Sequence, residues 1–327
     1  MRFGIISTAD IGLKSLLPAI QKSEHTAFAL ASRDTSHAER VAREYEIPRA
    51  YGSYEELLAD DDVDAVYNPL PNALHAEWTK RAADHGKDVL CEKPLTGDAA
   101  EAAELFDYVR ERDVTLMEAF MYRFHPRTER AVEIVERELG AVRSVDAAFS
   151  FSLDDDEDIR LDPHLAGGSV MDVGCYAVNA ARLFLGEPER VSARTADDRG
   201  AGVDTSMAAV FEYDDATARV ASGFDRAQSQ YYRVETADGW LQADPAFGTD
   251  ADESVTLEWH VAGRTVVEEF EPVDHYQLQV EAFADAVDGG SAPRITREET
   301  LGNMRAIDAI YESAASGAVV DVDSGRD

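Results

Sequence analysis

Residues 2–12 read RFGIISTADIG, and this short stretch decides the fold of the chain. Residues 2–7 form an apolar run of strand length, and from Ile11 to about Gln21 apolar residues recur at helical spacing. A strand that turns tightly into a helix begins a βαβ unit, and the amino terminus of that helix can receive a pyrophosphate. The stretch therefore predicts the dinucleotide-binding turn of a doubly wound α/β domain.

The turn keeps one glycine of the Gly-x-Gly-x-x-Gly pattern. Gly12 has the third position, and Ser7 and Ala9 stand in the first two. Small side chains at all three positions still let a dinucleotide approach the backbone closely. An ordinary strand-to-helix turn is the alternative. The residues predicted to contact the cofactor here are Ser7, Thr8, Ala9, Asp10, Ile11 and Gly12.

Apolar strands and amphipathic helices alternate as far as about residue 122. Strict alternation with short links indicates a parallel, doubly wound sheet, so we expect a dinucleotide-binding Rossmann domain over residues 1–122. Further strands are predicted at 26–32, 65–67, 88–91 and 115–119, and further helices at 36–45, 54–58, 73–84 and 99–110.

Beyond residue 122 the pattern changes to long segments in which apolar and polar residues alternate. This predicts an α+β domain over residues 123–327, with an open, mostly antiparallel sheet that buries one face. An apolar outer face would need cover, so we expect a homo-oligomer, a dimer or tetramer, through this sheet. The predicted strands are 144–153, 191–196, 205–213, 217–224, 231–236, 255–261 and 265–270, and the helices are 127–138, 169–184, 276–287 and 298–313.

The charge balance is strongly acidic. The 327 residues include 65 acidic and 31 basic side chains, a net charge of −34, and only five of the basic residues are lysines. The pattern resembles a halophilic cytoplasmic protein, and it argues against a nucleic-acid partner because phosphate binding needs a basic patch. We expect no membrane span, since no apolar run reaches about 18 residues. We expect no signal peptide, since residues 1–6 lead straight into a predicted strand without the signal pattern. The two cysteines form no zinc-binding pattern.

Ser32 and Arg33 end the second predicted strand, 25 residues after Ser7. An NAD enzyme usually has Asp or Glu here for the ribose 2′-hydroxyl. A serine hydroxyl and a guanidinium instead suit a 2′-phosphate, which favours NADP. The alternative is that Arg33 is an exposed arginine in a turn.

Two further motifs follow predicted strands at the same edge of the sheet. Glu92-Lys93-Pro94 places a lysine where it can bond a substrate hydroxyl, although a lysine that only caps a turn is equally compatible with the pattern. Pro71-Asn72-Ala73-Leu74-His75 follows the strand at 65–67, and Asn72 there is either a cofactor contact or a helix N-cap.

Residues 167–176, GGSVMDVGCY, open a helix in the second domain. Asp172 and Tyr176 are four residues apart and therefore project from one helical face. Beside Lys93 they would form a cluster able to handle a proton, whereas a purely structural role is the alternative.

Together these motifs resemble the family that contains glucose–fructose oxidoreductase, inositol dehydrogenase and dihydrodiol dehydrogenase, over essentially the whole chain. Glu92-Lys93-Pro94 is the most specific of them. The segment MEAFMYRFHP (residues 117–126) is most similar to the branch of dihydrodiol dehydrogenases and NADP-linked pentose dehydrogenases. The other motifs are residues 7–12, Asn72 with His75, residues 167–176, and His275-Tyr276 with residues 281–283.

The resemblance implies NADP-dependent oxidation of C1 of an aldopyranose, with D-xylose the first candidate, to the aldonolactone, without a metal. It implies Lys93 and Tyr176 as the catalytic pair, Asp172 as an assistant, and a cis Lys93–Pro94 peptide. The remaining predicted cofactor contacts are Pro71, Asn72, His75, Glu92, Lys93 and Arg123, and the predicted sugar contacts are Lys93, Arg123, Asp172, Tyr176, His275 and Tyr276. The alternatives are a dehydrogenase of a cyclitol, dihydrodiol or imine, and a catalytically silent NADP sensor.

Overall fold

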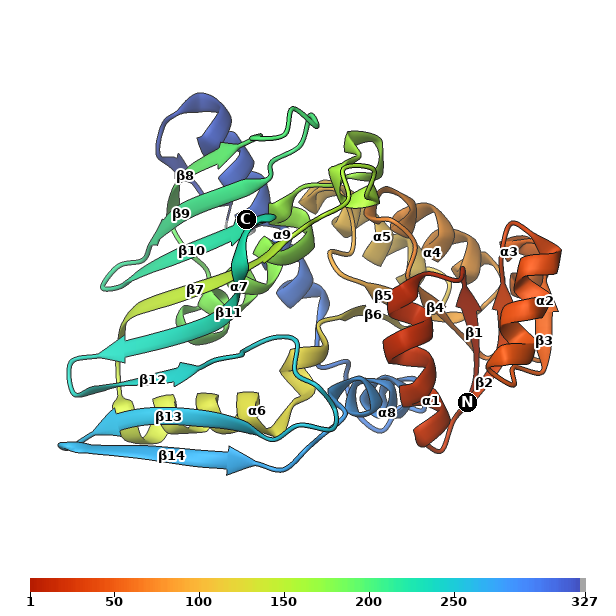
Figure 1. Cartoon of the computed structure of the whole chain (residues 1–327), viewed down its shortest axis with the longest axis horizontal. Coiled ribbons are helices and arrows are strands. Elements are labelled where there is room, and N and C mark those ends of the chain that lie inside the picture. Colours follow the sequence, from red (N-terminus) through yellow and green to blue (C-terminus); the bar gives the residue numbers. More distant parts are fainter. Residues whose placement is uncertain (324–327) are drawn as a thin grey trace. The chain divides into compact units, whose positions relative to one another are not determined.

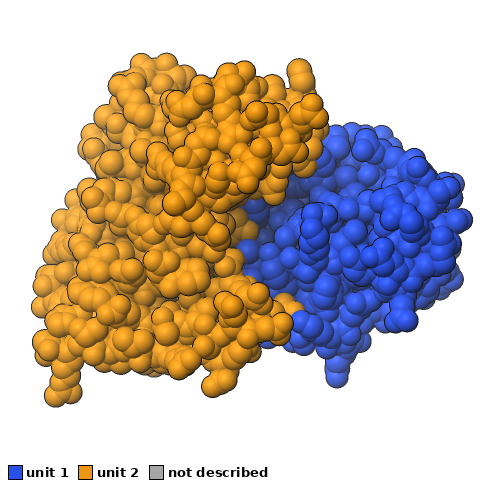
Figure 2. Space-filling view, in the orientation of Figure 1, with its two compact units in different colours: residues 1–121, 275–300 blue, residues 122–274, 301–327 orange. Residues whose placement is uncertain are grey.

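A computed structural model describes residues 1–323, which group into two compact units (Figure 2). Unit 1 contains residues 1–121 and 275–300, and unit 2 contains residues 122–274 and the chain from 301 onward. The first passage between the units lies within one residue of the predicted boundary. Residues 275–300, which the sequence pattern placed in the domain 123–327, group instead with unit 1.

Unit 1 is built on a six-stranded parallel sheet with the order β3-β2-β1-β4-β5-β6 (Figure 1). This order confirms the predicted doubly wound Rossmann sheet. The strands are β1 (Arg2–Ile6), β2 (Thr26–Ala31), β3 (Arg49–Tyr51), β4 (Ala65–Asn68), β5 (Asp88–Glu92) and β6 (Leu116–Ala119). The helices are η1 (Gly12–Leu16), α1 (Leu17–Lys22), α2 (Thr35–Glu44), α3 (Tyr54–Leu58), η2 (Asn72–Leu74), α4 (His75–Asp84), α5 (Ala99–Arg110) and α8 (His275–Val287).

Side-chain caps fix where three of these helices begin. Asp34, Ser53 and Asp98 each accept a hydrogen bond from the backbone N–H three residues later, at the starts of α2, α3 and α5. Unit 1 also gains α8, in which Phe283 packs against Phe3 of β1 with ring centroids 6.1 Å apart. This apolar contact gives a physical reason for α8 to group with unit 1.

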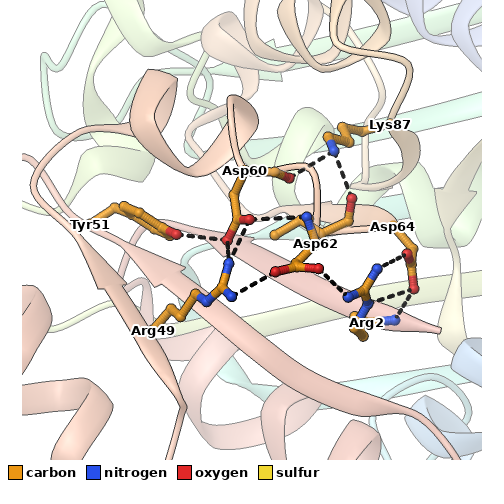
Figure 3. Close-up of polar contacts among 8 residues, drawn as sticks. Arg2, Arg49, Tyr51, Asp60, Asp62, Asp64 and Lys87 are labelled. Carbon is orange, nitrogen blue, oxygen red and sulfur yellow. Dashed lines mark hydrogen bonds and ion pairs between the residues drawn. The ribbon is translucent and has the colours of Figure 1, made fainter.

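A network of ion pairs lies at the amino edge of the parallel sheet, around the segment that leads into β4. The Arg49 guanidinium donates to Asp60 and to Asp62, each at 2.6 Å, and Arg2 donates to Asp62 at 2.7 Å. Burial alone would raise the pKa of Asp60, but hydrogen bonds from Tyr51 and Arg49 outweigh it and lower this pKa to about 2. Figure 3 shows the network, which Asp64 and Lys87 complete.

Unit 2 contains a nine-stranded sheet with the order β14-β13-β12-β11-β7-β10-β9-β8-β15. Its strand pairs are antiparallel except for the parallel pair of β7 and β10, so the prediction of an open, mostly antiparallel sheet is confirmed. The strands are β7 (Val142–Ser152), β8 (Arg190–Ala196), β9 (Ser206–Glu212), β10 (Thr217–Gly223), β11 (Asp225–Thr236), β12 (Gly239–Ala243), β13 (Val255–Val261), β14 (Arg264–Phe270) and β15 (Val320–Asp321). The helical segments are η3 (Met121–Phe124), α6 (Pro126–Ile134), η4 (Val135–Leu139), η5 (Ile159–Leu161), η6 (Pro163–Leu165), η7 (Val170–Gly174), α7 (Cys175–Leu185) and α9 (Arg297–Ser316), of which η3 and α9 cross the boundary between the units.

The two faces of this sheet differ in chemistry. One face is apolar and packs against α7, which contacts β7 and β10. The other face carries ion pairs, including Arg219 with Asp146 at 2.5 Å and Arg233 with Glu235 at 2.8 Å. The outer face is therefore mixed rather than apolar, and oligomerisation stays a prediction.

Candidate active site

The residues predicted to hold the cofactor follow the ends of neighbouring strands in unit 1. Ser7 follows β1, Ser32 follows β2, Asn72 lies in the segment after β4, and Lys93 follows β5. All these strands are parallel, so these positions share the carboxyl edge of one sheet. The order of strands reverses between β1 and β4, and doubly wound sheets bind ligands outside the carboxyl ends at such a point.

The turn after β1 has the backbone of a glycine motif without its first glycine. Ser7 has a φ of 89°, a region that favours glycine, and its hydroxyl accepts a hydrogen bond of 3.2 Å from the Ala9 N–H. At Gly12 an added Cβ would meet Tyr67 and Pro69 at 3.5 Å, which is ordinary contact. Of the three motif positions, Ser7 is therefore the one whose backbone adopts a conformation that favours glycine.

The helix after this turn begins irregularly. It opens with Asp10 and Ile11, passes through the π-helical turn η1 and continues as α1. The Asp10 carboxylate pairs with Lys14 one turn later at 2.6 Å. Single π-helical turns inside helices occur frequently at functional sites.

Ser32 and Arg33 lie between β2 and the amino terminus of α2. Arg33 is exposed, and Asp34 caps the helix. The Thr8 hydroxyl from the first turn contacts the His37 ring on α2 at 3.0 Å. An exposed guanidinium and a hydroxyl beside a helix amino terminus fit the 2′-phosphate of NADP.

His75 is fully buried at the start of α4. Its Nδ1 lies 2.9 Å from the Pro94 carbonyl and its Nε2 lies 2.6 Å from the Leu70 carbonyl. Burial lowers the pKa of this ring to about 4, so it is neutral at pH 7 and donates to one of the two carbonyls at a time. This geometry makes His75 a support for the Pro94 segment. Pro71 and Asn72 are half-buried, and α4 begins three residues after Asn72, which therefore does not N-cap this helix.

The Glu92-Lys93-Pro94 segment is held by buried polar contacts. The Lys93–Pro94 peptide is cis, as the family resemblance implies. The Glu92 carboxylate is buried and accepts a hydrogen bond of 2.8 Å from the Tyr67 hydroxyl on β4. Beyond Pro94, the Leu95 N–H donates to the buried Glu118 carboxylate at 2.9 Å.

His275 and Tyr276, predicted as sugar contacts, begin α8 and so belong to unit 1. Their rings meet edge to face with centroids 5.0 Å apart, and His275 is buried while Tyr276 is half-buried. Burial, and after it the neighbouring Glu92 carboxylate, raises the pKa of the Tyr67 phenol well above its usual value, and Tyr276 makes a smaller contribution in the same direction.

In unit 2, the Tyr176 ring lies in an aromatic cluster near the start of α7. Its centroid is 5.5 Å from that of Phe247, 5.6 Å from Phe149 and 6.0 Å from Tyr122. The side chain of Arg123 donates to Asn179, one turn beyond Tyr176, at 3.3 Å. Close aromatic packing restricts the orientation of the phenol.

Asp172 lies in the π-helical turn η7, directly before α7. Its Oδ2 accepts a hydrogen bond of 2.9 Å from the Arg160 guanidinium, which also contacts Asp158. The structure thus brings Arg123, Asp172 and Tyr176 together in unit 2, all on or against the helix that η7 and α7 form.

Four residues with a place in this arrangement were not predicted from the sequence. Tyr67 donates to Glu92, and Arg160 donates to Asp172. The Thr300 hydroxyl donates to Glu118, which also accepts from the Leu95 N–H. Glu118 lies inside the MEAFMYRFHP segment, and a charged residue at the end of an apolar strand was a signal that could have been used. Among residues 1–323, no group of three or more His, Cys, Asp or Glu side chains is placed to hold a metal ion, and no helix is long and apolar enough to cross a membrane.

The chain belongs to the GFO/IDH/MocA family of oxidoreductases. Residues 1–120 match the family described as "Oxidoreductase family, NAD-binding Rossmann fold", and residues 129–242 match the "GFO/IDH/MocA C-terminal domain". The resemblance inferred from the motifs is thereby confirmed.

Among its relatives is D-xylose 1-dehydrogenase (NADP(+)) 2 of Haloferax volcanii, which is 62% identical over 99% of this chain and 100% of that protein. Similar solved structures include the 3-ketoreductase KijD10 from Actinomadura kijaniata in complex with NADP and TDP-benzene. It has a TM-score of 0.90 and 33% identity, and the match covers 96% of this chain and 97% of that one. An aldose-aldose oxidoreductase from Caulobacter crescentus, complexed with glycerol, has a TM-score of 0.91 and 28% identity over 98% and 99% of the two chains.

Proposed function

We propose that this protein is an NADP-dependent dehydrogenase that oxidises C1 of an aldopyranose, D-xylose first among them, to the aldonolactone. The observation that carries the proposal is 62% identity to the Haloferax enzyme over 99% of the chain, together with the cofactor edge of unit 1. An enzyme of this kind needs a positioned alcohol, a base and a bound nicotinamide, and no metal.

NADP fits the residues at this edge. The turn of residues 7–12 would receive the pyrophosphate, and Ser32 with Arg33 would hold the 2′-phosphate. The bound cofactor supplies the acceptor for the hydride that leaves C1 of the sugar. Pro71, Asn72, Glu92, Lys93 and Arg123 complete the proposed cofactor contacts. His75 was expected as a further contact, but it is fully buried with both ring nitrogens at the Pro94 and Leu70 carbonyls, so it supports this segment instead.

The chain's own residues would handle the proton. Tyr176 removes the proton from O1 as the hydride leaves, and Lys93 orients the same hydroxyl and stabilises the phenolate. Asp172 accepts a hydrogen bond from a substrate hydroxyl, while Arg123, His275 and Tyr276 line the sugar. Lys93 and Tyr176 belong to different units, so their meeting over one hydroxyl is part of the proposal.

The habitat and assembly of the protein are proposed with the same reaction. The net charge of −34 and the similarity to the Haloferax volcanii enzyme support a cytoplasmic enzyme that works in concentrated salt. A dimer or tetramer through the sheet of unit 2 remains the expected assembly.

Reduction or oxidation of a different substrate is the second candidate. Trans-1,2-dihydrobenzene-1,2-diol dehydrogenase of Xenopus tropicalis is 36% identical over 64% of this chain, and the KijD10 structure is that of a ketoreductase. The deciding experiment is a screen for NADPH fluorescence with NADP⁺ in molar KCl, across pentoses, hexoses, cyclitols and a dihydrodiol. We expect D-xylose to give the highest kcat/KM. Turnover of a cyclitol or dihydrodiol in preference to every aldose would replace the proposal, and no turnover at all would leave the NADP sensor.

A further inference from the structure

Arg160 is the one arginine or lysine between Leu153 and Ser169, a loop that also contains the acidic run 154–158. Its guanidinium Nε donates to Asp172 Oδ2 at 2.9 Å, and its Nη1 donates to Asp158 at 3.1 Å. The loop therefore places its one arginine, Arg160, against the carboxylate of Asp172, which lies four residues before Tyr176.

The backbone around Arg160 is fixed by close contacts. The Arg160 carbonyl accepts a hydrogen bond of 2.8 Å from the Gly168 N–H, directly before the helix that carries Asp172. A Cβ at Gly167 would lie 2.4 Å from that carbonyl, so only glycine permits this approach. The Asp158 carboxylate accepts from the Arg160 N–H at 2.9 Å and starts the short helix η5. Both the N–H and the carbonyl group of Arg160 are therefore hydrogen-bonded.

We propose that Arg160 is a positioning residue for the oxidation described above: it holds the Asp172 carboxylate in the orientation in which this carboxylate accepts a hydrogen bond from the substrate. This inference rests on the proposed function. The inference goes further than the proposed function because neither the motifs nor the family resemblance identifies Arg160.

The exposure of the pair decides where its effect is expected. The side chain of Arg160 is 43% exposed and that of Asp172 is 19% exposed. Ion pairs this open to solvent contribute little to folding stability. An orienting contact can still change the rate strongly, because a misplaced substrate contact weakens transition-state binding.

A double-mutant cycle in molar KCl tests the inference. Arg160→Gln removes the charged donor, and we expect kcat/KM for D-xylose to fall roughly tenfold, the worth of one hydrogen bond to a charged group. The fall should come mainly from KM for the sugar, while KM for NADP⁺ changes less than twofold. Arg160→Lys should recover most of the loss. In an Asp172→Asn background, Arg160→Gln should cost less than a further twofold, because its partner is already altered.

Arg199→Gln is the matched control. The Arg199 guanidinium also bridges two aspartates, Asp156 and Asp225, and contacts the Leu153 carbonyl near the same loop. We expect it to leave KM for D-xylose within twofold. The inference is overturned if Arg160→Gln behaves like this control, or if its cost is undiminished on Asp172→Asn.

The same measurements separate this inference from the proposed function. Activity of the unmodified protein on D-xylose without coupling between Arg160 and Asp172 removes the inference alone. If the screen finds a different substrate and the double-mutant cycle with it shows coupling between Arg160 and Asp172, the proposed substrate is wrong and the inference stands. A protein that oxidises none of the substrates removes both.

Discussion

The Thr300 hydroxyl donates a hydrogen bond of 2.7 Å to the carboxylate of Glu118, which is fully buried at the end of β6. The other Glu118 oxygen accepts from the Leu95 N–H, two residues after Lys93, at 2.9 Å. One buried carboxylate therefore connects the segment of the proposed catalytic lysine to α9, more than 180 residues later in the chain.

Replacing Glu118 with alanine should destabilise the protein by about 3 kcal/mol, because two buried donors lose a charged acceptor. Glu118→Gln is the control and should cost about 1 kcal/mol, because its amide oxygen can accept from Leu95 while its NH₂ donates to Thr300. Urea unfolding in constant KCl measures both variants. Equal losses for the two would show that the hydrogen bonds are not the source of the stability.

The buried ring of His75 predicts a loss of stability in acid. Its pKa is lowered to about 4 in the folded protein, so the unfolded chain, with the ordinary value of about 6.5, binds the proton first as pH falls. This contribution is complete above pH 6.5 and is lost towards pH 4, by up to about 1.4 kcal/mol per pH unit. His125 has a pKa of about 4 for the same reason and adds a second contribution.

His75→Gln isolates the contribution of His75, because glutamine does not titrate. We expect the unfolding free energy of the variant to fall less steeply between pH 6.5 and 4 than that of the unmodified protein. Parallel slopes would mean that the ring is not held neutral in the folded state.

Arg33 predicts the choice of cofactor. Arg33→Ala should raise KM for NADP⁺ at least tenfold and leave KM for NAD⁺ nearly unchanged, because only NADP⁺ carries the 2′-phosphate that a guanidinium binds. Arg43→Ala, which removes an exposed arginine at the far end of α2, is the control. Equal effects on both cofactors would remove the specificity argument.

The sequence predicted the fold because the fold follows from local patterns. Alternation of strands and helices specified the parallel sheet, and period-two segments specified the second sheet. The short strands β3, β12 and β15 were missed, because two to five residues carry too little periodicity. Gly239 in β12 has its own reason: a Cβ there would lie 1.9 Å from the His260 carbonyl on the neighbouring strand. That requirement exists only after the strands pair.

The candidate site could be derived from the sequence only in part, for a different physical reason. Residues such as Lys93 and Asp172 stand in recognisable motifs, so chemistry and resemblance identify them. The residues that hold these groups in place stand in no such motif. Glu118 contacts Thr300, and Arg160 contacts Asp172, only because the folded loops and helices bring them together. Pairings of this kind depend on tertiary structure and leave no periodic signal in the chain.

The net charge of −34 predicts that stability depends on salt. Thermal unfolding midpoints should rise steeply from low to molar KCl, because salt screens the repulsion among carboxylates. The partly buried pair of Arg49 and Asp60 opposes this trend only weakly, because partly buried pairs are screened less than exposed ones. Sucrose at matched osmolality is the control, and a midpoint that sucrose raises as much as KCl would argue against charge screening.

We expect Tyr176→Phe to lower kcat without unfolding the protein. Phenylalanine keeps the ring that packs against Phe149 and Phe247, so the unfolding midpoint should change little. The missing hydroxyl should lower kcat by roughly 10²- to 10⁴-fold, the usual contribution of a general base, while NADP⁺ binding measured by calorimetry is retained.

Lys93→Ala should lower kcat to a similar extent. If both side chains act on one hydroxyl, the double variant should lose much less than the product of the two single losses. Losses that multiply would show that Lys93 and Tyr176 act independently, and a fully active Tyr176→Phe protein would remove the phenol from the mechanism.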